Sequence, residues 1–137
     1  MTIQETENQI IEEFAMFDNP TDKYSYIIEL GESLPKIDEE YKTDKYLIAG
    51  CQSQVWLQAE FSDGKIYFKA DSDAIITKGI IYLLIRVLSG RTAEEILEAK
   101  LNYIDTIGLK QHLSPTRSNG LVSMIKQMKV YALAIKN

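Results

Sequence analysis

The residue best suited to chemistry in this sequence is its single cysteine, Cys51. A cysteine thiolate is a strong nucleophile, and a loop can deliver it to a second molecule. Gly50 precedes it and permits close backbone approach, while Gln52 and Ser53 follow it and offer hydrogen-bond donors. Free cysteines are also among the most frequently buried residues, so an inert structural thiol is the alternative. The polar neighbours favour a functional thiol.

The only histidine, His112, is the one imidazole that could act as a base for Cys51. It lies just ahead of a predicted helix start, a place where histidines commonly satisfy backbone groups instead. Arg117 falls in the first turn of that helix, where a cation opposes the helix dipole. A specific partner and plain solvation explain Arg117 equally well. A small cysteine hydrolase that uses Cys51 and His112 therefore stays the alternative to a thiol that acts without its own base.

Acidic residues flank Ser72 in a way that could be mistaken for a metal motif. We predict that Ser72 caps a helix, with Asp71 and Asp73 placed favourably at its positive end. The spacing of a calcium loop is absent, and one cysteine with one histidine cannot make a structural zinc site. The sequence therefore predicts no metal site.

The first part of the chain predicts two helices. Thr2 and Glu5 form a capping-box pattern, and the apolar spacing that follows predicts a helix to Phe17. Residues 18–20 break it, Thr21 is the predicted cap of the second helix, and Gly31 ends that helix. Residues 37–44 are polar and predict a loop.

In the middle of the chain the apolar residues recur at every second position. Alternating apolar residues over 55–61 and 66–70, joined by a Ser-Asp-Gly turn, predict a β-hairpin. Residues 46–48 are a candidate third strand. The small and polar residues 49–53 predict a loop, which places Cys51 outside regular structure.

Three further helices are predicted. The first runs from Ser72 to residues 89–90, the second from a Thr92/Glu95 capping box to Leu101, and the third starts at residues 114–115. Helices, a small antiparallel sheet and then helices indicate an α+β fold, with helices packed on one face of two to three strands.

Composition excludes several classes of protein. The chain has 137 residues, 45% of them hydrophobic and 26% charged, which suits a single folded domain over residues 1–137. Its formal net charge of −5 opposes nucleic-acid binding. The apolar runs are too short to span a membrane, and the polar, acidic start does not resemble a signal peptide, so we expect a cytoplasmic protein. Phosphate-binding loops and the common hydrolase and metalloprotease motifs are absent.

Several motifs in order resemble the SufE family of sulfur acceptors, a resemblance that covers the chain from the second helix onward. They are residues 50–56 (GCQSQVW), residues 71–74 (DSDA) with Lys78 and Gly79, and residues 111–121 (QHLSPTRSNGL). The paralogous SufE and CsdE proteins share these motifs, and the resemblance does not choose between them.

The resemblance implies a SufE/NifU-like α+β fold and a sulfur carrier that has no cofactor of its own. Cys51 would take persulfide sulfur from a pyridoxal-phosphate (PLP)-dependent cysteine desulfurase of the SufS or CsdA kind, stimulating it. The sulfur would then pass toward iron–sulfur cluster assembly on a scaffold of the SufBCD kind. The residues expected to support the cysteine loop are Gly50, Gln52, Ser53, His112 and Arg117, and those expected at the rim of the partner contact are Asp71, Asp73 and Lys78.

Overall fold

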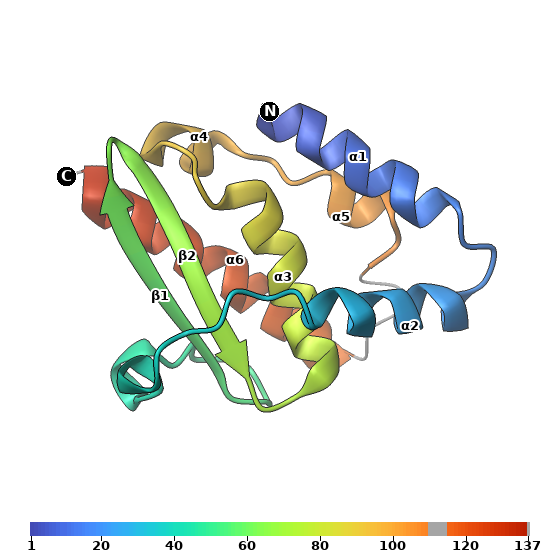
Figure 1. The fold of residues 1–137 in the computed structure, drawn as a ribbon, viewed down its shortest axis with the longest axis horizontal. Helices are drawn as coiled ribbons and strands as arrows, with labels where there is room; N and C mark the ends of the chain where they lie inside the picture. The colour runs from blue at the N-terminus through green and yellow to red at the C-terminus, as the bar shows by residue number, and fades with distance from the viewer. Residues whose placement is uncertain (110–114, 137) are drawn as a thin grey trace.

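A two-stranded hairpin and the helices packed against it make up the structure, a computed structural model (Figure 1). It describes residues 1–109 and 115–136, with side chains for 1–109 and 119–136. In chain order the helices, 3-10 turns (η) and strands are α1 (Ile3–Ala15), α2 (Pro20–Gly31), η1 (Glu39–Tyr41), η2 (Asp44–Tyr46), β1 (Val55–Ser62), β2 (Lys65–Ser72), α3 (Ile75–Leu88), α4 (Ala93–Glu98), α5 (Tyr103–Thr106) and α6 (Pro115–Lys136).

The hairpin buries one face and leaves the other largely open. β1 and β2 are antiparallel, with Val55 opposite Ser72 at one end and Ser62 opposite Lys65 at the turn. Alternate residues point into the core because the side chains of a strand alternate between its faces. These inward residues are Val55, Leu57, Ile66, Phe68 and Ala70, all at most 2% exposed. The helices pack on this face, which confirms the predicted α+β arrangement.

The predicted third strand is reduced to a single bridge. Leu47 pairs with Trp56, and the Ile48 N–H donates to the Val55 carbonyl at 2.8 Å. Residues just before this point form the η2 turn, and Gly50 then turns the chain away with a φ of +86°. A strand needs a longer extended run on both sides, so pairing cannot propagate.

α3 forms the centre of the core, as its continuous apolar sequence predicts. Ten of its residues are buried, and α2 lies directly against it. A Cβ at Gly79 would overlap the carbonyl oxygen of Ile27 on α2. Glycine at this position therefore allows the two helix backbones to approach closely.

Two of the predicted helix caps are present in the structure and two are not. The capping boxes of Thr2 with Glu5 and of Thr92 with Glu95 are both present. The predictions for Thr21 and Ser72 were wrong: Asn19 caps α2, with Pro20 as its first residue, and α3 starts after Ala74. α5 was not predicted. α1 and α4 also end earlier than expected, at Ala15 and Glu98.

Ser72 does not cap α3 because the hairpin extends further than its apolar pattern. Ser72 is the last residue of β2, paired with Val55. Its Oγ donates to the Gln54 carbonyl at 2.7 Å and accepts from the Ala74 N–H at 3.2 Å. The hydroxyl therefore joins the sheet to the segment that leads into α3.

Candidate functional site

Cys51 lies on a loop, as predicted, between the Leu47 bridge and the start of β1. Its side chain is half-buried, and its thiol donates to the Gly120 carbonyl of α6 with an Sγ to oxygen distance of 3.6 Å. The partner lies 69 positions later in the sequence. The loop is therefore held against the helix that the chain forms later.

Gly50 is required by the shape of this loop. Its φ of +86° lies in the left-handed region that residues with a Cβ rarely adopt. A Cβ at this position would also lie 2.5 Å from the Ser123 Oγ of α6. Both conformation and space thus exclude a larger residue unless the loop moves.

A small cavity adjoins the thiol. Its volume is about 80 Å³, and it is lined by Cys51, Gln52, Ser53, Thr77, Ile80, Gly120 and Met124. The predicted supporting residues Gln52 and Ser53 are thus beside Cys51, the first exposed and the second half-buried. Since a cavity needs only roughly 10–15 Å³ of such space to admit a water molecule, this one has room for an additional sulfur atom next to Sγ.

The electrostatics of the cavity favour a neutral thiol. Burial raises the pKa of Cys51 above its ordinary value, because a thiolate loses hydration when it is taken out of water. The described residues that line the cavity include no cation to oppose this effect. His112 lies outside the described residues, and so does the side chain of Arg117, so their predicted support of the loop stays a prediction.

Asp73, predicted at the rim of a partner contact, holds the far end of the cysteine loop. Its Oδ1 accepts from the Gln54 N–H at 3.1 Å, and the Gln54 carbonyl accepts a hydrogen bond from the Ser72 hydroxyl. These contacts fix the exit of the loop to the segment just before α3. A loop fixed at its exit and bent at Gly50 can move chiefly between these points.

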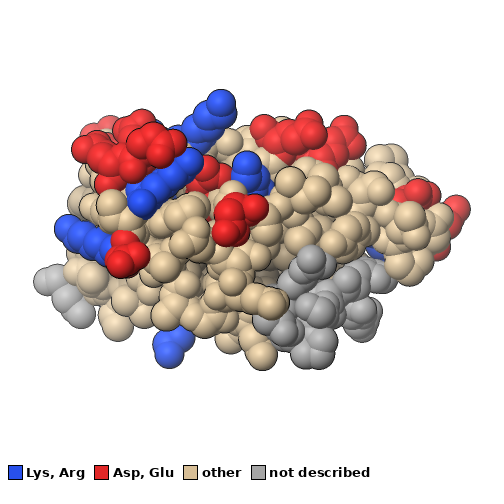
Figure 2. Space-filling model, turned by 90° about the horizontal axis from the view of Figure 1, so that it is seen from below, with Lys and Arg blue, Asp and Glu red and all other residues tan. Residues whose placement is uncertain are grey.

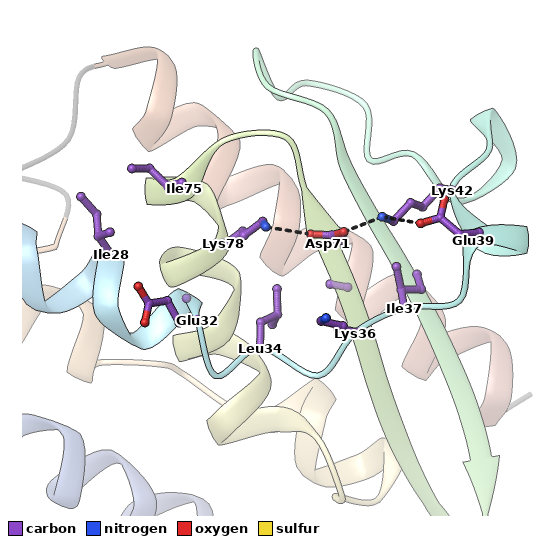
Figure 3. Close-up of a pocket in the computed structure, with 12 residues that line it drawn as sticks. Ile28, Glu32, Leu34, Lys36, Ile37, Glu39, Lys42, Asp71, Ile75 and Lys78 are labelled. Carbon is purple, nitrogen blue, oxygen red and sulfur yellow. Dashed lines mark hydrogen bonds and ion pairs between the residues drawn. The ribbon is translucent and has the colours of Figure 1, made fainter.

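Asp71 and Lys78 line a different cavity, on another side of the start of α3 (Figure 3). Asp71 forms ion pairs with Lys42 at 2.8 Å and with Lys78 at 3.6 Å. The cavity has a volume of about 410 Å³ and an apolar wall that includes Leu34 and Ile37. The residues predicted at one rim are therefore divided between two places.

The outward side of α6 next to the cysteine loop carries apolar side chains. Val122, Val130 and Leu133 are 53%, 47% and 51% exposed, and their spacing places them with Lys126 along one side of the helix. A groove of about 290 Å³, lined by Gly50, Lys126 and Val130 among others, separates this side from the loop. Figure 2 shows the end of the molecule where β1 begins: charged side chains gather along one margin and a broad area is largely uncharged.

Five described residues at this site were missed from the sequence: Thr77, Ile80, Gly120, Ser123 and Met124. All come from helices distant along the chain, and their types carry no chemical signal. Among the described residues, no three metal-ligating side chains cluster as a metal ion would need. No helix in this part of the chain is both long and apolar enough to cross a bilayer.

Comparison with known proteins matches most of this chain to one family. The family model described as "SufE: Fe-S metabolism associated domain" matches residues 8–132. A "SufE-like protein 1, chloroplastic/mitochondrial" of Arabidopsis thaliana is 38% identical over 129 residues, which cover 93% of this chain and 35% of that protein. This chain thus spans about a third of the Arabidopsis protein.

Two bacterial relatives are matched over most of their own length. An uncharacterised SufE-like protein of Rhizobium meliloti is 40% identical over 127 residues, covering 89% of this chain and 91% of the relative. One of Synechocystis is 36% identical over 128 residues, covering 93% and 80%. The solution structure of a hypothetical protein from Thermus thermophilus has the same fold, with a TM-score of 0.77 at 19% identity over 94% of both chains. The chain belongs to the SufE family.

Proposed function

We propose that this protein is a sulfur carrier in iron–sulfur metabolism, which accepts persulfide sulfur from a PLP-dependent cysteine desulfurase on Cys51 and passes it on. The observation that carries the proposal is the cavity of about 80 Å³ beside a half-buried thiol. A carrier needs one thiol that another protein can reach and a place where the loaded sulfur is shielded. Membership of a family described as associated with Fe-S metabolism supports the same role.

The proposed transfer is a thiol exchange without hydrolysis. The Cys51 thiolate attacks the outer sulfur of a persulfide on the donor's cysteine. A sulfur–sulfur bond forms on Cys51 while the donor's own sulfur–sulfur bond breaks, and the donor's cysteine leaves as a thiolate. The transferred sulfur keeps its proton and the negative charge passes from Cys51 to the donor's cysteine, so no oxidant, reductant or water is consumed. The cofactor PLP belongs to the donor, which carries out the carbon–sulfur cleavage.

Because burial raises the pKa of the Cys51 thiol, less of it is thiolate in the free protein than in an exposed cysteine. The thiolate is the attacking species, so docking has to bring Cys51 out of its buried setting or supply a cation there. Bending at Gly50 would allow this movement, because that residue is exposed and conformationally free. We propose that the donor protein approaches over the uncharged area beside α6, where exposed apolar side chains suit protein contact.

We propose a scaffold of the SufBCD kind as the recipient and the cytoplasm as the compartment. Asp71, Asp73 and Lys78 stay candidates for the edge of the donor contact, with Asp73 nearer to the loop exit. The alternative function, a hydrolase that uses Cys51 and His112, requires a base beside the thiol. None of the described residues lining the thiol's cavity is such a base.

Mass spectrometry of the intact protein tests the proposal. The protein is incubated with a purified cysteine desulfurase and L-cysteine, beside a Cys51→Ser variant. We expect a gain of one sulfur atom that a thiol reductant removes and that the variant lacks. If several desulfurases give no gain although Cys51 alkylates readily in the folded protein, the carrier role is wrong. Turnover of ester or amide substrates that depends on both Cys51 and His112 would then support the hydrolase.

A further inference from the structure

Thr77 is a buried polar residue that the proposed transfer does not use. It is the third residue of α3, only 5% exposed, and it lines the cavity with Cys51. Within the described part of the chain its hydroxyl makes no hydrogen bond to protein, whereas the buried hydroxyls of Thr6, Ser72 and Tyr103 are all paired. Among the described residues no side-chain oxygen or nitrogen is both sealed from solvent and unpaired, so the Thr77 hydroxyl keeps access to solvent, and the cavity beside Cys51 is the space that it lines.

The other residues of the cavity wall provide few polar groups. Ile80, Met124 and the backbone of Gly120 provide apolar atoms and one carbonyl, which already accepts from Cys51. Cys51 is the only residue among the described lining residues that titrates. The first turn of α3 also places the positive end of a helix dipole at this wall. The wall therefore offers a hydroxyl donor, and the helix dipole favours a negatively charged group beside Sγ.

A sulfur atom bound to Cys51 would enter this space and displace water from it. The Thr77 hydroxyl would then lose its solvent partner, and the incoming sulfur would be the acceptor that replaces it. A neutral sulfur accepts only weakly, but a terminal persulfide sulfur that has lost its proton carries a full charge. Donors to a charged group form the stronger hydrogen bonds.

We propose that Thr77 is a positioning residue for the loaded state: its hydroxyl donates a hydrogen bond to the terminal, deprotonated sulfur of the Cys51 persulfide. This inference rests on the proposed function. It assigns the retention of sulfur to α3, while the movement that receives and delivers sulfur belongs to the loop. Thr77 takes no part in making or breaking the sulfur–sulfur bond.

The test loads Cys51 without a desulfurase, so that it does not depend on the choice of donor. Cys51 is first converted to a mixed disulfide with an aromatic thiol. Hydrosulfide then displaces the aromatic thiolate and leaves the persulfide, with atoms and electrons balanced. Thr77→Val removes the hydroxyl and keeps the side-chain shape, whereas Thr77→Ser keeps the hydroxyl and loses a methyl group. The pH at which alkylation of the persulfide reaches half its maximum rate is measured for each protein.

We expect the half-maximum to move up by about one pH unit in Thr77→Val, which corresponds to a tenfold loss of preference for the charged sulfur. Thr77→Ser should stay at the original value although its packing is altered. Equal values for the original protein and Thr77→Val would overturn the proposal, and so would equal shifts in Ser and Val, which indicate packing alone. If Thr77→Val does not fold, Thr77→Ala against Thr77→Ser gives the same comparison.

The two proposals fail in distinguishable ways. If the carrier role is wrong, no desulfurase loads Cys51, yet the chemically loaded persulfide still reports on Thr77. If the Thr77 role alone is wrong, desulfurase loading proceeds and the alkylation profiles coincide.

Discussion

Two cavities flank the start of α3, and they differ in size, charge and content. The cavity next to Cys51 measures about 80 Å³ and has one titrating residue among its described walls. The other, about 410 Å³, is crossed by the Lys42–Asp71–Lys78 ion pairs. Thr77 and Ile80 line the first, while Ile75 and Lys78 line the second. Lys42, Asp71 and Lys78 in the larger cavity are paired with one another, so we expect this cluster to contribute stability and the smaller cavity to contribute chemistry.

The largest expected effect comes from Gly50→Ala. The added Cβ meets the Ser123 hydroxyl and opposes a φ of +86°, so the loop has to shift. A displacement of the reacting atom by about 1 Å can cost up to 100-fold in rate. We therefore expect desulfurase-dependent sulfur loading to slow by roughly 10- to 100-fold in this variant.

A matched control separates this clash from backbone strain. Gly64 in the hairpin turn has a similar φ of +80° but nothing within 4 Å of an added Cβ. Gly64→Ala should lower the free energy of unfolding by roughly 1 kcal/mol and leave sulfur loading unchanged. Equal loading rates for Gly50→Ala and the original protein would show that the loop geometry does not limit transfer.

A smaller effect is expected when the exit of the loop is released. Asp73→Ala removes the acceptor for the Gln54 N–H, and we expect alkylation of Cys51 by iodoacetamide to speed up roughly three- to tenfold. Asp71→Ala acts on the other cavity and should leave this rate unchanged. Acceleration by both variants alike would mean that the two sides of α3 are not independent.

The pH dependence of alkylation sharpens the comparison further. Because burial raises the pKa of the Cys51 thiol, the folded protein should reach half its maximum rate at a higher pH than the urea-unfolded chain. The unfolded value should lie near about 8.5. A folded value at or below the unfolded one would mean that a cation near the loop outweighs burial. Repeating the measurement with Arg117→Ala and His112→Ala would then identify that cation.

The smallest effect concerns the charged cavity. Burial alone would raise the pKa of Asp71, but hydrogen bonds from Lys42 and the Ser72 backbone, with the charges of Lys42 and Lys78, outweigh it and lower the pKa. The folded state thus favours the carboxylate, and the stability it contributes is present above about pH 3.9 and lost as pH falls through the lower folded pKa.

Asp71→Asn should therefore lose no more than about 1 kcal/mol at neutral pH, a difference that shrinks in acid. Urea unfolding at pH 7 and pH 3 measures it. A difference that grows in acid would contradict the assigned direction of the pKa shift. Alkylation of Cys51 by iodoacetamide should not change in this variant, because Asp71 does not line the Cys51 cavity.

Local patterns predicted the hairpin, most helices and the loop position of Cys51. Periodicity and capping boxes depend on residues a few positions apart, so a single short segment is enough to predict a helix or a strand. The end of β2 was misjudged at Ser72 because its partner, Gln54, lies across the hairpin. The contact of Cys51 with Gly120 depends on how α6 packs, over a separation of 69 residues. Thr77 was missed for the same reason: its importance lies in the cavity that it shares with Cys51, which only packing reveals.

The hydrogen bond from Cys51 to Gly120 also has a consequence for biosynthesis. The ribosome makes the cysteine loop well before it makes α6, and nascent chains lengthen at roughly 5–20 residues per second. Until α6 docks, Cys51 has no shelter and its thiol is open to oxidation, some of it irreversible. Slow docking of α6 would therefore produce molecules that fold normally but carry an irreversibly oxidised Cys51.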